Sequence, residues 1–136
     1  MKRVTRKIEF DAGHRLVGHE SKCRNLHGHR YVAEIEVGAE DLDEVGRVID
    51  FGVVKQLVGG WVDEHWDHGM LINVEDKELV ELCRKSGWKH YVMCSEPTAE
   101  NLVVDLFARA VRELPLYVKV LSVRLYETPN CWADYP

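Results

Sequence analysis

The sequence lacks the features that would place it in a membrane, in a disulfide scaffold or on nucleic acid. No hydrophobic stretch approaches the roughly 20 residues that a membrane-spanning helix needs, and no apolar segment follows the basic start at 1–7. The four cysteines include no CxxC pair, so neither a thiolate zinc site nor a redox pair is indicated. Acidic residues outnumber basic ones by 23 to 18, and the net charge of −5 argues against broad binding to nucleic acid. We therefore expect a cytoplasmic protein with free thiols and with neither a membrane nor a nucleic-acid partner.

The length and composition indicate one globular domain. The chain has 136 residues, of which 46% are hydrophobic and 30% are charged, and it contains no low-complexity segment. A chain of this size buries about two-thirds of the surface that it exposes when unfolded. We expect a single domain over 1–136.

Two hydrophobic periodicities divide the chain into strands and helices. The first two predicted strands alternate apolar and polar side chains, as half-buried antiparallel strands do. The first and last predicted helices carry apolar residues at helical spacing and begin after Asp50 and Thr98, which both suit helix N-caps. The predicted strands are 4–12, 31–37, 46–49, 88–94 and 117–127, and the predicted helices are 50–65, 75–85 and 98–114.

This order of elements predicts an α+β fold, with an antiparallel sheet and helices on one face. Such a sheet has open edges, and natural proteins usually cover or join them. We therefore expect the sheets of several subunits to close into a β-barrel.

The densest group of reactive side chains lies at 23–29. In an extended segment, His27 and His29 point to the same side, so both imidazoles can bind one ion. His14 ends the alternating row of the first strand and is the best candidate for a third ligand. Three protein ligands and one open position are typical of a catalytic zinc site. An HxH pair alone, however, serves equally well as a surface or core pair without a metal.

Three further side chains are open to more than one interpretation. Glu127 ends the apolar row of the last predicted strand. Either it has a function there, or the strand ends at Tyr126 and leaves Glu127 in solvent. His65 lies on the apolar stripe of a helix, which favours packing over metal binding. Cys23 is either a reactive thiol or a small buried hydrophobic residue.

Six ordered motifs resemble the 6-pyruvoyl-tetrahydropterin synthase superfamily, and most of all its 6-carboxytetrahydropterin synthase branch in the queuosine pathway. The resemblance runs almost from end to end. Its motifs are Phe10-Asp11-Ala12-Gly13-His14-Arg15-Leu16, Cys23-x-x-x-His27-Gly28-His29, Val48-Ile49-Asp50-Phe51, Trp66-Asp67-His68, Pro97-Thr98-Ala99-Glu100-Asn101 and Tyr126-Glu127-Thr128-Pro129.

The resemblance implies a metal centre and a proton acceptor. The histidines that bind zinc in the family correspond to His14, His27 and His29. The catalytic proton acceptor of the family corresponds to Cys23. Zinc held by three neutral ligands would lower the pKa of substrate hydroxyls and stabilise the anion that forms from them.

The resemblance also implies partners for Cys23 and for the substrate. His68, beside Asp67, and Glu127 correspond to the residues that relay protons with the catalytic cysteine. Glu127 would also bind the pterin ring, because a carboxylate can accept two hydrogen bonds from adjacent N–H groups. Thr98 and Glu100 are candidates for further contacts with the pterin.

The reaction implied is the conversion of 7,8-dihydroneopterin triphosphate and water to 6-carboxy-5,6,7,8-tetrahydropterin, acetaldehyde and triphosphate. One alternative is the pyruvoyl-forming reaction, which eliminates triphosphate from the same substrate without breaking a carbon–carbon bond. Another is an inactive, zinc-containing pterin-binding module. The resemblance implies the tunnelling fold, with two barrel rings stacked into a homo-hexamer and active sites between subunits.

Overall fold

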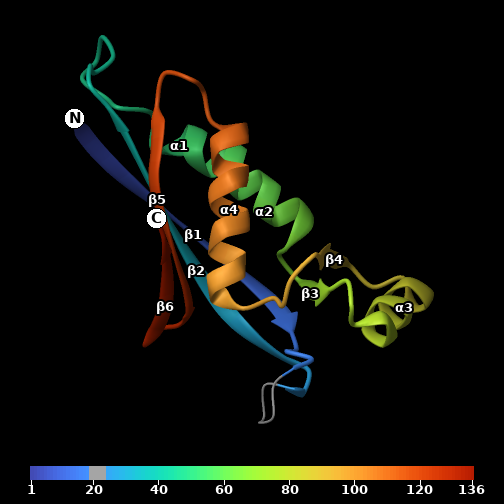
Figure 1. Cartoon of the computed structure of the whole chain (residues 1–136). Helices are drawn as coiled ribbons and strands as arrows, with labels where there is room; N and C mark the ends of the chain where they lie inside the picture. The colour runs from blue at the N-terminus through green and yellow to red at the C-terminus, as the bar shows by residue number, and fades with distance from the viewer. Residues whose placement is uncertain (19–23) are drawn as a thin grey trace.

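The computed structural model describes residues 1–18 and 24–136, which form one curled sheet with helices packed against it (Figure 1). The six strands have the spatial order β4-β3-β1-β2-β5-β6. The strands are β1 (Lys2–His14), β2 (His27–Ala39), β3 (Gly69–Asn73), β4 (His90–Met93), β5 (Lys119–Thr128) and β6 (Cys131–Tyr135). The helices are α1 (Phe51–Val54), the π-helical turn η2 (Lys55–Gly59), α2 (Gly60–His65), α3 (Lys77–Ser86) and α4 (Ala99–Glu113).

The α+β class is confirmed, but the sheet is mixed instead of wholly antiparallel. β1, β2, β5 and β6 pair antiparallel, whereas β3 runs parallel to β1 and β4 runs parallel to β3. Parallel neighbours need a crossover connection, and α3 provides it between β3 and β4.

The long β1–β2 pair forms the centre of the sheet. Each strand has 13 residues, and the register runs from Lys2 opposite Ala39 to His14 opposite His27. Alternate side chains on one face enter the core, where Phe10 stacks on Tyr31 with ring centroids 5.1 Å apart. The other face of the pair is polar and carries ion pairs such as Lys7–Glu34 at 3.5 Å. The alternation predicted for both strands is confirmed.

α1, η2 and α2 form the helix predicted at 50–65. Asp50 caps it, because its side-chain oxygen accepts a hydrogen bond from Gly52 N at 2.8 Å. The π-helical turn ends at Gly59, at the glycine pair that weakens helical propensity. His65 packs against Trp61 with ring centroids 4.7 Å apart, in agreement with the packing role predicted for it.

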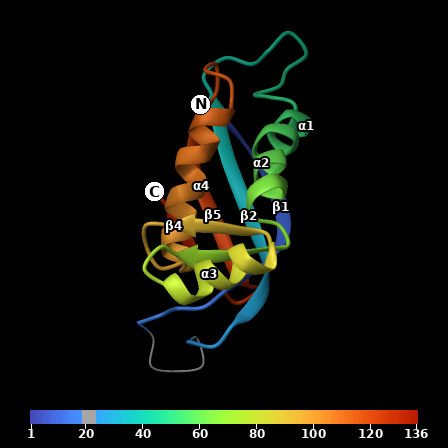
Figure 2. The ribbon, with the colours of Figure 1, turned by 90° about the vertical axis from the view of Figure 1, so that its right-hand side faces the viewer.

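α4 lies along β5 and β6 and covers the same face of the sheet as α1 and α2 (Figure 2). Thr98 caps it by accepting a hydrogen bond from Asn101 N at 3.2 Å, as predicted. Its buried stripe consists of Ala99, Leu102, Val103, Leu106 and Ala110. Among the described residues, no helix is long and apolar enough to cross a membrane.

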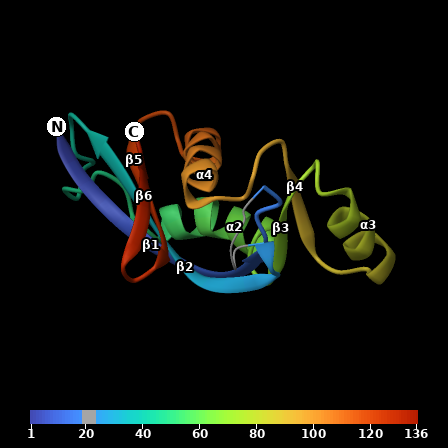
Figure 3. The same ribbon diagram turned by 60° about the horizontal axis from the view of Figure 1, so that its bottom comes forward.

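α3 lies beyond β3 and β4, away from α4 (Figure 3). Leu71 belongs to the main core, whereas its neighbour Ile72 packs with Leu79 and Cys83 of α3. Because successive strand residues point to opposite faces, α3 covers the other side of β3. The prediction of helices on one face therefore holds for α1, α2 and α4 but not for α3.

The strand predicted at 46–49 is absent, and β6 follows the last predicted strand. In place of the strand, Asp43 Oδ1 accepts hydrogen bonds from Val45 N and Arg47 N and closes a turn. Val48 and Ile49 then enter the core from this loop. Their burial explains the apolar pattern, which resembles that of a short strand.

Candidate metal centre and active site

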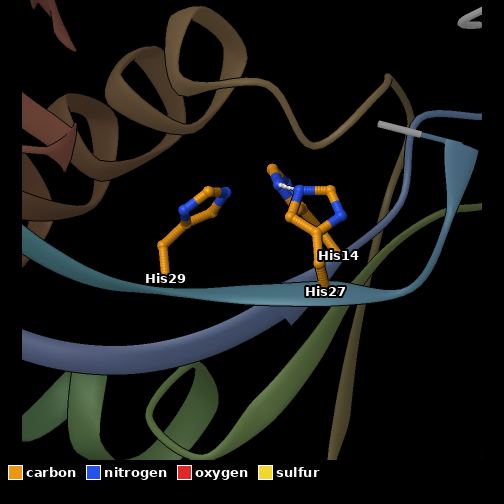
Figure 4. A group of neighbouring side chains, drawn as sticks. All are labelled: His14, His27 and His29. Atoms are coloured by element: carbon orange, nitrogen blue, oxygen red, sulfur yellow. Dashed lines mark hydrogen bonds between the residues drawn. The ribbon is translucent and has the colours of Figure 1, made fainter. Parts of the chain in front are cut away.

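Three histidines meet at one end of the β1–β2 pair (Figure 4). His14 lies directly opposite His27, and His29 lies two residues further along β2, opposite Ala12. Opposed residues in antiparallel strands, and residues two apart in one strand, point to the same face. The ring centroids are 4.6 Å apart for His14 and His27, 5.1 Å for His14 and His29, and 5.0 Å for His27 and His29. One nitrogen from each ring lies within 4.8 Å of the other two, so the group predicted from the HxH pair and the strand end is brought together.

Backbone carbonyls orient two of the three rings. His14 Nδ1 donates a hydrogen bond to Pro97 O, and His27 Nδ1 donates one to Asn25 O, both at 2.7 Å. A carbonyl only accepts, so each neutral ring carries its hydrogen on Nδ1 and presents the lone pair of Nε2. The two Nε2 atoms face each other at 3.0 Å. Two lone pairs at this distance repel each other unless a proton or a cation lies between them.

His29 contributes the third nitrogen of the group, and this nitrogen has no hydrogen-bond donor or acceptor of its own among the residues that the structure describes. Its Nε2 is buried and makes no hydrogen bond in the described part of the chain, although Glu127 Oε1 lies 3.3 Å away. Burial without a partner is costly for a polar atom and is relieved by a metal ion. Orientation of ligand rings by hydrogen bonds from their second nitrogen is usual in metal sites. The residues therefore fit a metal ion.

The electrostatics of the centre favour the neutral form of two imidazoles, those of His14 and His29. Burial lowers the pKa of His14, although its hydrogen bond to Pro97 and the charge of Glu127 oppose this. Burial likewise lowers the pKa of His29, again against the opposing charge of Glu127. Neutral imidazole is the form that binds metals, so the environment keeps these rings ready to act as ligands.

Glu127 points into the site instead of into solvent. β5 continues through Thr128, so the alternative in which the strand ends at Tyr126 is wrong. Its side chain is 29% exposed and lies beside His29. Sequence periodicity placed Glu127 at the end of the apolar row, and the structure shows that this row leads to the histidines.

Asp67 and His68 form a hydrogen-bonded pair next to β1. His68 Nδ1 donates to Asp67 Oδ2 at 2.9 Å, and Asp67 Oδ1 accepts from Asp11 N at 2.9 Å. Desolvation would raise the pKa of Asp67, but the hydrogen bonds from Asp11 N and His68 outweigh it and lower the pKa. His68 has a φ of 59°, a left-handed conformation that is uncommon for a residue other than glycine. Its backbone N donates to Asp11 O at 2.6 Å and stabilises this conformation.

The pair lies on the other face of β1 from the three histidines. Asp11 and His14 differ by an odd number of positions along the strand, so their side chains point to opposite faces. His68 lines a shallow depression with Gly13, Gly28 and Arg30; His29 also lines it, although His29 alternates with Arg30 and its imidazole belongs to the face of His14. Within one chain, therefore, the structure does not bring His68 together with the metal centre.

The remaining predicted site residues have different outcomes. Cys23 lies outside the described residues. Thr98 acts as the cap of α4, and Glu100 is exposed in the first turn of that helix. No hydrogen bond or ion pair in the described ranges 1–18 and 24–136 joins either residue to the three histidines, although Thr98 directly follows Pro97, whose carbonyl accepts from His14. The carbonyls that orient the rings were not predicted, because a backbone group leaves no signal in a pattern of side chains.

Comparison with known proteins identifies relatives that match this chain over nearly its whole length. The family described as 6-pyruvoyl tetrahydropterin synthase matches residues 3–136. A 6-carboxy-5,6,7,8-tetrahydropterin synthase of Rickettsia bellii is 43% identical over 98% of this chain and 99% of its own length. The protein of that name from Rickettsia felis is 45% identical with the same coverage.

Solved structures show the same fold. An uncharacterized protein of Wolinella succinogenes superimposes with a TM-score of 0.83 at 24% identity, over 98% of this chain and 97% of its own. The 6-pyruvoyl tetrahydropterin synthase of Caenorhabditis elegans gives a TM-score of 0.70 at 24% identity, over 99% and 96% of the two chains. With the sequence match over nearly the whole length, these findings show that the chain belongs to the 6-pyruvoyl tetrahydropterin synthase family.

Proposed function

We propose that the protein is a zinc-dependent lyase that converts 7,8-dihydroneopterin triphosphate and water to 6-carboxy-5,6,7,8-tetrahydropterin, acetaldehyde and triphosphate. The observation that carries the proposal is the group of three converging histidines, found in a chain 43–45% identical to synthases of this name. The reaction would serve queuosine biosynthesis in the cytoplasm.

His14, His27 and His29 would hold the ion. Three imidazoles with an open fourth position are the ligand set of catalytic zinc, and imidazole suits zinc better than it suits magnesium or calcium. Zinc bound there would supply a Lewis acid that lowers the pKa of the side-chain hydroxyls of the substrate.

Cys23 would accept the proton that leaves the substrate side chain, with Asp67 and His68 as its partners. Asp67 holds the hydrogen of His68 on Nδ1, so Nε2 is the atom left to exchange a proton with the thiol. Because His68 faces away from its own metal centre, we infer that it serves the site of a neighbouring subunit. Closure of the sheets into a barrel, and a homo-hexamer with sites between subunits, would bring the two together.

Glu127 would bind the pterin ring beside the metal centre, with Thr98 and Glu100 at the edge of the same site. A carboxylate accepts hydrogen bonds from two adjacent N–H groups, and Glu127 is buried enough for these bonds to contribute strongly. Thr98 retains its hydroxyl hydrogen for donation, because its oxygen is the atom that caps α4.

Glu127→Gln should weaken binding of the pterin by about 2 kcal/mol or more, since one acceptor becomes a donor that faces N–H groups. Isothermal titration with a pterin that lacks the side chain measures this loss. Glu34→Gln is the matched control, because Glu34 lies on the outer face of β2 and pairs with Lys7. Equal affinities of Glu127→Gln and the wild type would contradict the assignment.

The reaction itself is tested by product analysis. The zinc-loaded protein is incubated with 7,8-dihydroneopterin triphosphate, and the pterin product is identified by mass spectrometry. 6-Carboxytetrahydropterin with acetaldehyde supports the proposal. 6-Pyruvoyltetrahydropterin would establish the alternative synthase reaction, and binding without turnover would establish an inactive pterin-binding module.

A further inference from the structure

Two chain segments far apart in the sequence meet behind the metal centre. His14, at the end of β1, donates from Nδ1 to Pro97 O, just before α4. Three residues after His14, Val17 N donates to Glu96 Oε2 at 2.9 Å. The segments 14–17 and 96–97 are therefore joined twice, once through the metal-binding histidine and once through the carboxylate of Glu96.

Glu96 has further partners that fix its own position. Its Oε1 accepts from Asn73 Nδ2 at 2.8 Å, which connects it to the end of β3. Its backbone carbonyl accepts from Asn101 Nδ2 at 2.9 Å and from Thr98 N at 2.8 Å, within the first turn of α4. No Lys or Arg of the described residues forms an ion pair with Glu96, so its carboxylate acts here as a hydrogen-bond acceptor.

We propose that Glu96 is a positioning residue for the metal centre. By joining Val17, Asn73 and the start of α4, it holds the Pro97 carbonyl against His14 Nδ1. That carbonyl fixes the hydrogen of His14 on Nδ1 and leaves Nε2 directed at His27 Nε2, where the three rings would hold the ion. Partners of this kind, beyond the ligands themselves, contribute to metal affinity because they orient the ligand and set its tautomer.

Zinc affinity measures the positioning role of Glu96 directly. The inference rests on the proposed metal centre but not on the proposed reaction. Glu96→Ala removes both acceptor oxygens, and we expect zinc affinity, measured by competition with a chromogenic chelator, to fall on the order of 10-fold. Glu96→Gln keeps one acceptor oxygen but turns the other position into a donor that faces an N–H group. It should lose affinity by a smaller factor while staying close to the native shape.

Asp43→Ala is the matched control. Asp43 also accepts two backbone hydrogen bonds, from Val45 N and Arg47 N, but it closes a turn that contains no metal ligand. Its loss should lower stability while leaving zinc affinity unchanged. A fall in zinc affinity for Asp43→Ala as large as for Glu96→Ala would reduce Glu96 to a structural role and overturn the inference.

The metal-free protein gives a second readout. Long-range proton–nitrogen NMR spectra of the imidazoles report which nitrogen of His14 carries the hydrogen. We expect Nδ1–H in the wild type and a mixture of tautomers in Glu96→Ala. Wild-type zinc affinity and an unchanged His14 tautomer in both Glu96 variants would overturn the inference, whereas a wild type that binds no zinc would overturn the metal centre itself.

Discussion

Replacing His29 with alanine is expected to abolish stoichiometric zinc binding while leaving the protein folded. The wild type should bind about one zinc per chain through His14, His27 and His29, since three protein ligands and an open position define a catalytic site. The variant keeps only His14 and His27. Because the fold has its own hydrophobic core, it does not need the metal to form, unlike a small structural zinc domain.

Elemental analysis of purified protein measures this outcome, with circular dichroism to establish that the variant is folded. His90→Ala is the matched control, because His90 Nδ1 also donates to a backbone carbonyl, that of Trp88, at 2.8 Å. His90 belongs to no group of converging ligands in the described chain. Full zinc content in folded His29→Ala would contradict the assignment of His29 as a zinc ligand. Loss of zinc from His90→Ala would contradict the assignment of the three histidines as the zinc site.

The fold was predictable where one face of a strand or helix is buried and the other face is exposed to solvent. β1 and β2 satisfy this condition over most of their length, so their alternation gives both the strands and the shared face of His14, His27 and His29. The helix caps Asp50 and Thr98 were predictable for a local reason, because each accepts a hydrogen bond from its own first turn.

The fold predictions were wrong where the burial pattern of a segment does not determine its secondary structure or its pairing. Val48 and Ile49 are buried in a loop, and an apolar run in a loop has the same pattern as a short strand. β3 and β4 are short, and the direction in which a strand pairs with its neighbour is not encoded in its own periodicity. The mixed sheet is therefore a property of the connections between strands.

The sequence predicted which side chains belong to the candidate site, but it did not predict on which face of the sheet each of them lies. The motif at 66–68 singles out Asp67 and His68 as candidate site residues, yet it does not show that they lie on the other face of β1 from the three histidines. The face follows from the strand register, in which Asp11 and His14 alternate, and from the position of His68 beside Asp11. The Pro97 and Asn25 carbonyls decide the tautomers of His14 and His27. They could not be predicted from the pattern of side chains, because every residue has a backbone carbonyl.

Cys23→Ala is expected to lower turnover by on the order of 10² to 10⁴, the usual loss when a positioned general base is removed. The three histidines and Glu127 remain in place, so zinc content and substrate affinity should change little. A defect confined to the rate, with binding retained, is what distinguishes a proton acceptor from a binding residue. Single-turnover rates and titration with substrate separate these two quantities, and Cys94→Ala, which removes a different cysteine whose thiol is exposed, is the control.

Chemical modification tests the same assignment independently. A cysteine that accepts protons must be available as thiolate, which is also the form that iodoacetamide alkylates. Cys83 should react slowly, because it is buried and burial raises the pKa of its thiol. Cys94 and Cys131 are exposed and are therefore the real competitors. If peptide mapping after brief alkylation finds either of them modified before Cys23, and Cys23→Ala keeps near-normal turnover, another residue accepts the proton. Protection of Cys23 by bound pterin would instead place the thiol inside the substrate site, which neither an exposed nor a buried structural cysteine would show.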